Sequence, residues 1–265
     1  MNILKKIIKH KRNELFFKKK LISIEDFESF KLFDMKTLSL KNSINCSDYG
    51  IIAEFKRRSP SISNINQHSN VQDVAIGYMN AGASGISTLT DQKYFGGSIE
   101  DLLLAKSSSN IPILRKDFIV DEYQIYEAKA YGADVILLIA AILSVKKLKN
   151  LSQKAKELKL EVLLEVHSIE EINLYSNDNI DIIGVNNRDL KTFTTSLDVS
   201  KKLISHIPDN FIKISESGIS RINSINELKE VGYNGFLIGE MFMKNQNPSE
   251  EACNFINSLK KQHED

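Results

Sequence analysis

The chain has 265 residues, of which 42% are apolar and 26% are charged, and its formal net charge is +1. These values are typical of a folded globular protein, so they exclude a mainly disordered chain and argue against a surface that binds polyanions throughout. The length allows one domain or two, because an α/β barrel uses about 250 residues as a single domain.

The first 48 residues precede the first expected strand and are predicted to be helical. Apolar residues recur at roughly helical spacing through 3–16, and a second apolar cluster follows at 27–33. Eight Lys and Arg side chains against one Glu give residues 1–20 a local charge of +7, which leaves about −6 on the remainder. Such an arm can bind membranes or nucleic acids. We predict instead that it packs on the rest of the protein and turns its basic face to solvent.

Eight short apolar runs follow at fairly regular intervals and are predicted to be β-strands. Their spacing averages about 26 residues, enough for one strand, one helix and two short loops. The runs show little polar alternation, as expected of parallel strands that are covered on both faces. They occupy residues 51–55, 85–89, 111–114, 135–139, 161–166, 180–185, 211–214 and 235–238.

Helix signals fill the intervals between these strands. Residues 98–101 and 168–171, for example, fit or approximate a capping box. Eight strand–helix units predict a (β/α)8 TIM barrel over residues 49–265, with residues 1–48 as a helical extension packed on it in a single domain overall. A doubly wound sheet fits less well, because it usually has five or six strands and the sequence contains neither GxGxxG nor GxxxxGK[ST].

Polar side chains end six of the eight runs, and the C-terminal ends of the strands form the active site in barrels of this type. Alternation places Glu54 and Lys56 on the same strand face as Ile52, so all three face the barrel interior if Ile52 does. The charged residues expected at the barrel mouth are Glu54, Lys56, Lys116, Glu165 and Glu216. Each alone is typical of a salt bridge, but together they exceed what a structural network tolerates. The set predicts an enzyme that uses acid–base chemistry.

The seventh and eighth strands each end in a glycine. The pairs Ser217-Gly218 and Gly239-Glu240 would let backbone N–H groups approach an oxyanion, and barrels commonly bind phosphate at this place. Glycine could serve the tight turn alone, but its presence after two adjacent strands favours a phosphate site. Together with the lysines and the absence of a metal-ligand cluster in the sequence, this predicts metal-free chemistry on a phosphorylated sugar.

Six motifs occur along the chain in a recognisable order. They are IAEFKRRSPS at 52–61, LTDQKYFGGS at 89–98, LRKDFI at 114–119, LEVH at 164–167, VNNRDL at 185–190 and SESG at 215–218. The series resembles that of the indole-3-glycerol phosphate synthase family, and residues 2–8 resemble the N-terminal helical extension of that family. The family converts 1-(2-carboxyphenylamino)-1-deoxyribulose 5-phosphate to indole-3-glycerol phosphate, carbon dioxide and water in tryptophan biosynthesis. The resemblance implies a carboxy-lyase with neither cofactor nor metal.

The resemblance also implies catalytic roles. The matching residues are Lys116, Lys56, Glu165, Glu54, Asn186 and Glu216. Lys116 matches the general acid that protonates the ribulose carbonyl oxygen during ring closure. Lys56 matches a lysine that contacts the substrate carboxylate and acts in the dehydration, with Glu54 as its neighbour. Glu165 matches the acid that accepts or relays a proton when the ring aromatises. Asn186 matches a residue that positions polar groups of the substrate, and Glu216 matches a further acid of the site.

Substrate-binding residues follow from the same resemblance. They are Ser59, Phe95, Arg188, Ser217, Gly218, Gly239 and Glu240. The last four match the family's phosphate cup, Phe95 matches the position where the family packs the anthranilate ring, and Ser59 and Arg188 match positions that complete its substrate shell. The chain departs from the family at 62–63, where Ile-Ser replaces a frequent Lys-Gly, and at 241–243, where Met-Phe-Met replaces a frequent Ser-Leu-Met.

Two other functions are compatible with parts of the sequence. A phosphosugar aldolase could use Lys56 or Lys116 as a Schiff-base nucleophile, and an inactive barrel could bind nucleic acid or membranes through its basic arm. We rank both lower and expect a small phosphorylated substrate, no nucleic acid, no membrane and a monomer, with a weak homodimer as the alternative. Cys46 and Cys253 form no CxxC or zinc spacing, and no signal peptide is evident, so we expect a cytoplasmic protein.

Overall fold

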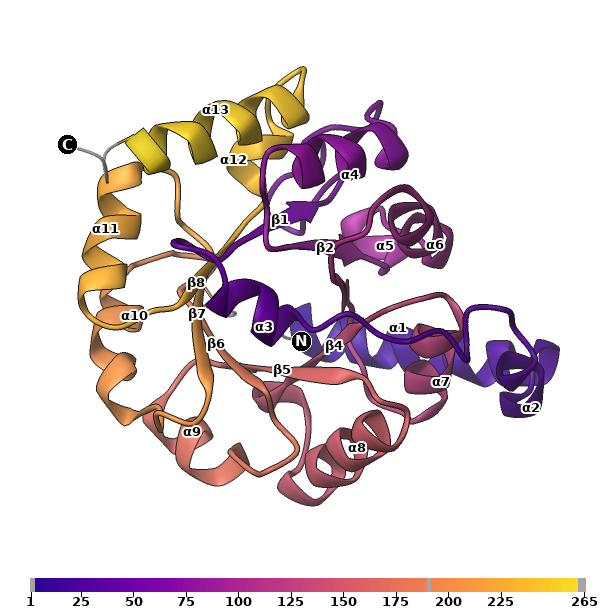
Figure 1. Cartoon of the computed structure of the whole chain (residues 1–265). Coiled ribbons are helices and arrows are strands. Elements are labelled where there is room, and N and C mark those ends of the chain that lie inside the picture. Colours follow the sequence, from indigo (N-terminus) through magenta and orange to yellow (C-terminus); the bar gives the residue numbers. More distant parts are fainter. Residues whose placement is uncertain (1–2, 190–191, 262–265) are drawn as a thin grey trace.

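The structure is a closed barrel of eight parallel strands arranged in sequence order, so the predicted (β/α)8 fold is confirmed (Figure 1). The computed structural model describes residues 3–189 and 192–261. Asn2, of the N-terminal stretch 2–8, and Leu190, of the VNNRDL motif, lie outside the described residues. The strands are β1 (Ile51–Phe55), β2 (Gly85–Leu89), β3 (Ile113–Lys116), β4 (Val135–Ile139), β5 (Glu161–Val166), β6 (Ile182–Asn186), β7 (Ile212–Glu216) and β8 (Gly235–Ile238). Pairing of residues 51–53 in β1 with residues 236–238 in β8 closes the barrel.

Among the described residues, three helices precede the first strand, and the others follow the strands and surround the barrel (Figure 1). They are α1 (Ile3–Leu21), α2 (Ile24–Glu28), α3 (Leu40–Asn45), α4 (Val71–Asn80), α5 (Gln92–Phe95), α6 (Ile99–Ser108), α7 (Tyr123–Ala130), α8 (Val145–Glu157), α9 (Ile169–Tyr175), α10 (Asp198–Leu203), α11 (Ile222–Glu230), α12 (Glu240–Met243) and α13 (Pro248–Lys261). As the sequence predicts, Ser98 and Ser168 cap α6 and α9, because their side chains accept hydrogen bonds from backbone N–H groups of the first turn. Across the described residues, none of the helices is both long and apolar enough to cross a membrane.

Three strands differ from their predicted bounds. β7 runs from Ile212 to Glu216 rather than over residues 211–214. β3 begins at Ile113 rather than at residue 111 because Pro112, which has no N–H group, precedes it. The strand then extends to Lys116, which places this lysine within the regular sheet rather than in the following loop. β6 begins at Ile182, because Ile180 still belongs to a turn in which its N–H donates to the carbonyl of Asn177.

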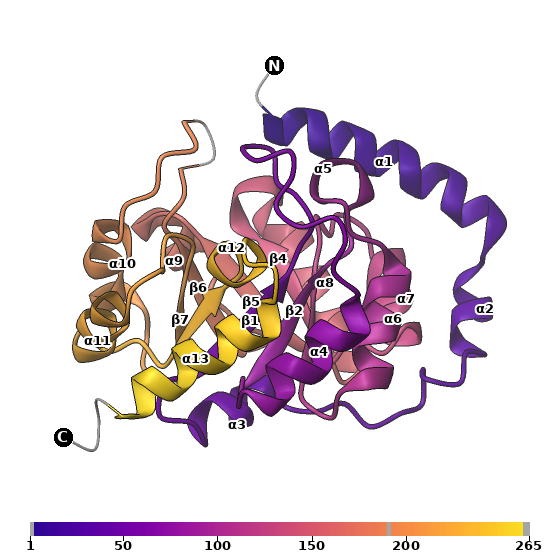
Figure 2. The same ribbon diagram turned by 90° about the horizontal axis from the view of Figure 1, so that it is seen from above.

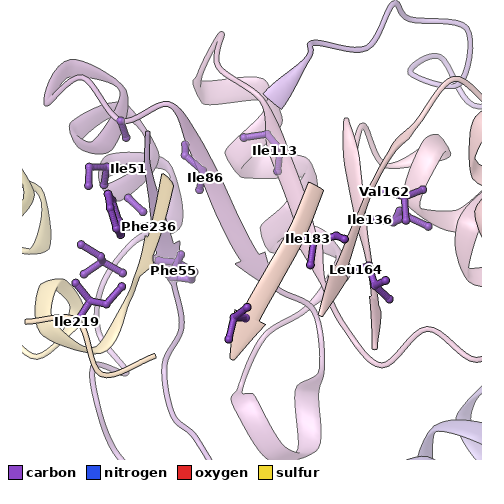
Figure 3. Close-up of a cluster of buried hydrophobic side chains, with 14 of the residues drawn as sticks. Ile51, Phe55, Ile86, Ile113, Ile136, Val162, Leu164, Ile183, Ile219 and Phe236 are labelled. Atoms are coloured by element: carbon purple, nitrogen blue, oxygen red, sulfur yellow. The ribbon is translucent and has the colours of Figure 1, made fainter. Parts of the chain in front are cut away.

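The hydrophobic core has two layers, one inside the barrel and one between the strands and the surrounding helices. Ile52 belongs to the inner cluster together with Leu114 and Leu163, as the predicted alternation along β1 requires. The neighbouring Ile51 and Phe55 belong to the outer cluster, which Figure 3 shows spread along several strands. The side chains at positions 54 and 56 therefore continue the inner face toward the end of β1.

Two of the N-terminal helices, α1 and α3, lie at opposite ends of the barrel. Figure 2 shows α1 along one end and α3 along the other. Leu40 and Ile44 of α3 and Ile7 of α1 are buried in the inner cluster, so both helices contribute to its packing. The basic residues of α1 are mostly exposed, but Lys11 is a clear exception with 1% exposure. Amphipathic spacing alone did not predict that a lysine of this segment is buried.

Candidate active site

A cavity of about 680 Å³ lies at the end of the barrel where the strands terminate. Its wall includes all thirteen residues predicted for the site, which are Glu54, Lys56, Ser59, Phe95, Lys116, Glu165, Asn186, Arg188, Glu216, Ser217, Gly218, Gly239 and Glu240. Ile3, Leu4 and Ile7 of α1 also line it. The cavity is therefore built jointly by the barrel and by the helix that crosses its end.

Charged side chains from alternate strands meet on the cavity floor. Nζ of Lys116, at the end of β3, lies 3.1 Å from Oε2 of Glu165 on β5 and donates a hydrogen bond to Oε2 of Glu216 on β7. At the end of β1, Nζ of Lys56, the residue that follows the strand, lies 2.8 Å from Oε1 of Glu54. Odd-numbered strands contribute one layer of inward side chains in such barrels, which explains why these groups meet. Two lysines and three carboxyl groups thus lie together on the cavity floor.

Burial and the neighbouring charges shift the pKa values of the clustered groups in different directions. Burial opposes the charged form of Lys116, but the carboxylates of Glu216, Glu165 and Glu54 outweigh it and raise the lysine pKa. Burial raises the pKa of Glu216 to about 7, with the nearby charge of Glu165 contributing and Lys116 opposing. Burial also acts on Glu165, but Lys116 and His167 outweigh it and lower its pKa. The floor therefore holds a cationic acid beside a carboxylate base, as acid–base catalysis requires.

Two further side chains, Asn186 and His167, lie beside Glu165. The side chain of Asn186, at the end of β6, hydrogen-bonds to Glu165 and also accepts a 3.0 Å hydrogen bond from the N–H of Arg188. Nε2 of His167 lies 3.8 Å from Oε1 of Glu165, and its Nδ1 lies 3.6 Å from Glu171. His167 is typical of a structural residue when judged from sequence, whereas its position beside Glu165 became evident only in the structure.

Two glycines provide the space that the carboxylates occupy. A Cβ added to Gly184 in β6 would lie 2.2 Å from Oε1 of Glu216, and one added to Gly239 would lie 2.6 Å from Oε1 of Glu54. Gly239 was predicted from its position after β8, but Gly184 was missed. A glycine within a β-strand interior often marks such a close approach, and this signal could have identified it.

We expect Gly184→Ala to lower kcat by about 10- to 100-fold, because a displacement of about 1 Å can cost 10²-fold. The added methyl group cannot share the space of the Glu216 carboxylate, so the contact of Glu216 with Lys116 must change. Overpacking should also cost about 1–3 kcal/mol of stability. Steady-state kinetics and thermal unfolding would measure the two effects.

Gly232→Ala is a suitable control for this experiment. It strains a turn whose φ is +113°, and Gly232 does not line the cavity. We expect it to lower the melting temperature and leave kcat unchanged. Equal kcat values for the two variants would show that the space beside Glu216 has no importance for turnover.

The loops after β6 and β7 form one side of the cavity. Ser217 and Gly218 both have positive φ values, 69° and 77°. The side-chain amide of Asn187 donates to the carbonyl oxygens of Glu216 and Ser217 at 3.0 and 3.1 Å, and thereby holds this turn. After β8, α12 begins directly at Glu240. A short helix beside the loops after strands seven and eight is the usual phosphate-binding arrangement in such barrels.

The rest of the cavity rim combines a polar contact between loops with an apolar wall. Arg188 approaches Oε2 of Glu240 at 3.5 Å and donates to Oγ of Ser61 at 3.3 Å, which joins the loops after β1, β6 and β8. Near α1, the rings of Phe95 and Phe118 lie 5.9 Å apart. The polar loops and the aromatic pair give the cavity two chemically different ends.

A turn occupies the position where the sequence departs from the family motif. Backbone hydrogen bonds run both ways between Ser59 and Ile62, at 2.8 and 3.1 Å. Oγ of Ser59 also accepts from the N–H of Ile62 at 3.2 Å and lies 3.1 Å from Oγ of Ser61. Ile62 therefore closes a hydrogen-bonded turn at the cavity rim.

Comparison with known proteins places these features in a family. The model of the family "Indole-3-glycerol phosphate synthase" matches residues 4–255. An indole-3-glycerol phosphate synthase of Bacteroides thetaiotaomicron is 47% identical, with 97% of this chain and 99% of the relative covered. One of Aliarcobacter butzleri is 41% identical, with the same coverage of 97% and 99%.

A solved structure, 3-hexulose-6-phosphate synthase from Salmonella typhimurium, has a TM-score of 0.64 at 13% identity, with 81% of this chain and 100% of that chain covered. At that identity the structural likeness supports the barrel fold alone. The family model and both relatives extend over nearly the whole chain. The chain therefore belongs to the indole-3-glycerol phosphate synthase family.

Proposed function

We propose that the protein converts 1-(2-carboxyphenylamino)-1-deoxyribulose 5-phosphate to indole-3-glycerol phosphate, carbon dioxide and water. The observation that carries this proposal is the contact of Lys116 with Glu165 and Glu216 on the floor of a cavity with one aromatic and one polar end. Family membership supports the same reaction. A protonated lysine beside a carboxylate suits proton transfer, whereas a Schiff base would need the neutral amine.

The two ends of the cavity would fix the two ends of the substrate. The anthranilate ring would pack against Phe95 and Phe118, and the phosphate would bind at the backbone of Ser217 and Gly218 beside the start of α12. This leaves the reacting carbons above the charged floor. Binding energy from both ends can then hold the aromatic carbon against the ribulose carbonyl carbon.

Ring closure would use Lys116 as the general acid. A bond forms between the ring carbon that bears the carboxylate and the ribulose carbonyl carbon, while Nζ of Lys116 transfers a proton to the carbonyl oxygen. Negative charge would otherwise develop on that oxygen in an enclosed site. The C–CO₂ bond then breaks, carbon dioxide leaves, and its electron pair returns to the iminium nitrogen and restores the aromatic ring.

Dehydration would use Lys56 and Glu165. Lys56, which first contacts the substrate carboxylate, donates a proton as the new hydroxyl group leaves as water, and Glu165 takes a proton from the carbon beside the nitrogen. The reaction thus consumes two protons and returns one, and the remaining proton comes from solvent. Glu165 can pass its proton to Lys116 because their polar atoms are 3.1 Å apart.

A direct assay tests the function. We expect purified protein to form an indole chromophore and release one carbon dioxide per substrate, with unchanged activity in the presence of a metal chelator. Failure to form the indole chromophore would refute the proposal. Borohydride treatment during turnover distinguishes the synthase reaction from the aldolase hypothesis. An adduct trapped on Lys56 or Lys116 would support a Schiff-base mechanism instead.

A further inference from the structure

Lys11 of α1 forms a buried ionic contact with the barrel. Its Nζ lies 3.1 Å from Oδ1 of Asp117 and 3.3 Å from Oδ2 of Asp91, and all three side chains are 1% exposed. Oε2 of Glu14, on the same helix, lies 3.1 Å away. A buried ammonium group is costly unless carboxylates of good geometry compensate for its lost water. The buried ammonium group of Lys11 is therefore stable only while both aspartates stay close to it.

Asp117 holds the chain immediately after Lys116. Its Oδ1 accepts a 2.8 Å hydrogen bond from the N–H of Phe118. Its Oδ2 accepts hydrogen bonds from Oγ1 of Thr90 at 2.7 Å and from Arg115 at 3.1 Å. The position of Asp117 thus determines how β3 ends, and Lys116 is the last residue of that strand.

Asp91 holds the segment that carries Phe95. Its Oδ1 accepts a 2.7 Å hydrogen bond from the N–H of Tyr94 and caps α5, and its carbonyl oxygen accepts from the N–H of Gly97 at 3.0 Å. Its Oδ2 receives no hydrogen bond from the part of the chain that the structure describes, and its ionic partner there is Lys11. Lys11 thus completes the environment of this carboxylate.

We propose that Lys11 is a positioning residue for catalysis: its ammonium group joins Asp117 and Asp91, and so fixes the end of β3 that bears Lys116 relative to the α5 segment that bears Phe95. The inference rests on the proposed function, in which Lys116 transfers a proton to a substrate whose ring packs on Phe95. Lys11 itself does not line the cavity. It acts through the two aspartates, and α1 is therefore part of the catalytic framework as well as of the cavity wall.

A different ionic contact of the same helix provides a matched control. Nζ of Lys18 lies 2.8 Å from Oε1 of the buried Glu127 on α7, and Glu127 also contacts Arg115 at 2.6 Å. Lys18→Met removes an attachment of α1 to the barrel but leaves Asp91 and Asp117 with Lys11. A role of Lys11 in helix attachment alone predicts the same behaviour for Lys11→Met and Lys18→Met.

The experiment compares the wild-type protein with these two variants in kcat, KM and thermal unfolding. We expect both variants to melt at lower temperature, but Lys11→Met alone to lose about 10- to 100-fold in kcat, with a smaller change in KM. Amide exchange supplies a readout that does not depend on activity. The Tyr94 and Phe118 amides, which donate to Asp91 and Asp117, should exchange faster in Lys11→Met than in Lys18→Met.

Asp91→Asn replaces Lys11→Met as the test variant if Lys11→Met fails to fold. It keeps the shape of the Asp91 side chain and removes the negative charge that contacts Lys11. We expect it to reduce kcat in the same direction. Wild-type kcat and exchange in Lys11→Met, or in Asp91→Asn where the first variant does not fold, would overturn the inference. An inactive wild-type protein would instead refute the proposed function, and the exchange comparison would still test whether Lys11 holds both segments.

Discussion

Lys116→Met is expected to lower kcat by about 10² to 10⁴-fold, the usual contribution of a positioned general acid. Methionine is close to lysine in length but cannot protonate the ribulose carbonyl oxygen. Lys116 lies among three buried carboxyl groups. Among the described side chains, no other cation is equally placed between Glu165 and Glu216. Single-turnover measurement of indole formation at saturating substrate would report the loss.

Lys106→Met is the matched control for this variant. Lys106 is also largely buried and pairs with a buried carboxylate, since its Nζ lies 2.8 and 2.7 Å from the two oxygens of Asp134. Asp134 immediately precedes β4, so this pair lies at the end of the barrel away from the cavity. The control should lose stability and retain kcat. Wild-type turnover in Lys116→Met would remove Lys116 from its assigned role.

Glu165→Gln is expected to lower the rate of indole formation by about 10² to 10⁴-fold as well, because an amide cannot accept the proton that aromatisation releases. The variant keeps the shape of the side chain and its place on β5. Since decarboxylation precedes this proton transfer in the proposed sequence, carbon dioxide release in a single turnover should be slowed less than indole formation. Following both products in one reaction separates the two steps.

Glu161→Gln provides the comparison on the same strand. Glu161 begins β5 at the other end of the barrel, where its carboxylate accepts hydrogen bonds from Oγ of Ser39 at 2.5 Å and from the N–H of Lys41 at 3.0 Å. We expect this change to affect stability alone. If Glu165→Gln slowed both products equally, Glu165 would act at or before decarboxylation, contrary to the proposed order.

Much of the fold was predictable because its signals are local. Strand and helix patterns alternate along the chain, and a barrel that pairs its strands in sequence order needs little further information. The charged floor was predictable for a related reason: alternation along β1 places Glu54 and Lys56 on the face of Ile52, and the ends of parallel strands meet at one edge.

The features that the sequence did not reveal depend on contacts between distant segments. Gly184 matters because the neighbouring strand β7 carries Glu216 into the space beside it. Lys11 resembles the other lysines of α1 in sequence, and its burial depends on Asp91 and Asp117 from two separate βα loops. Hydrophobic periodicity describes which face of a helix is apolar, but it does not indicate that one lysine of that helix meets two buried carboxylates.

The pairing of β1 with β8 also has a consequence for how the enzyme gains activity during synthesis. Residues 51–53 of β1 pair with residues 236–238 of β8. This edge of β1 therefore stays unpaired until the last strand has left the ribosome. Gly239, which makes room for Glu54, arrives at the same moment. Barrel closure and completion of the cavity floor thus both require β8 and the glycine after it, and a nascent chain that lacks them is expected to be inactive and prone to aggregate.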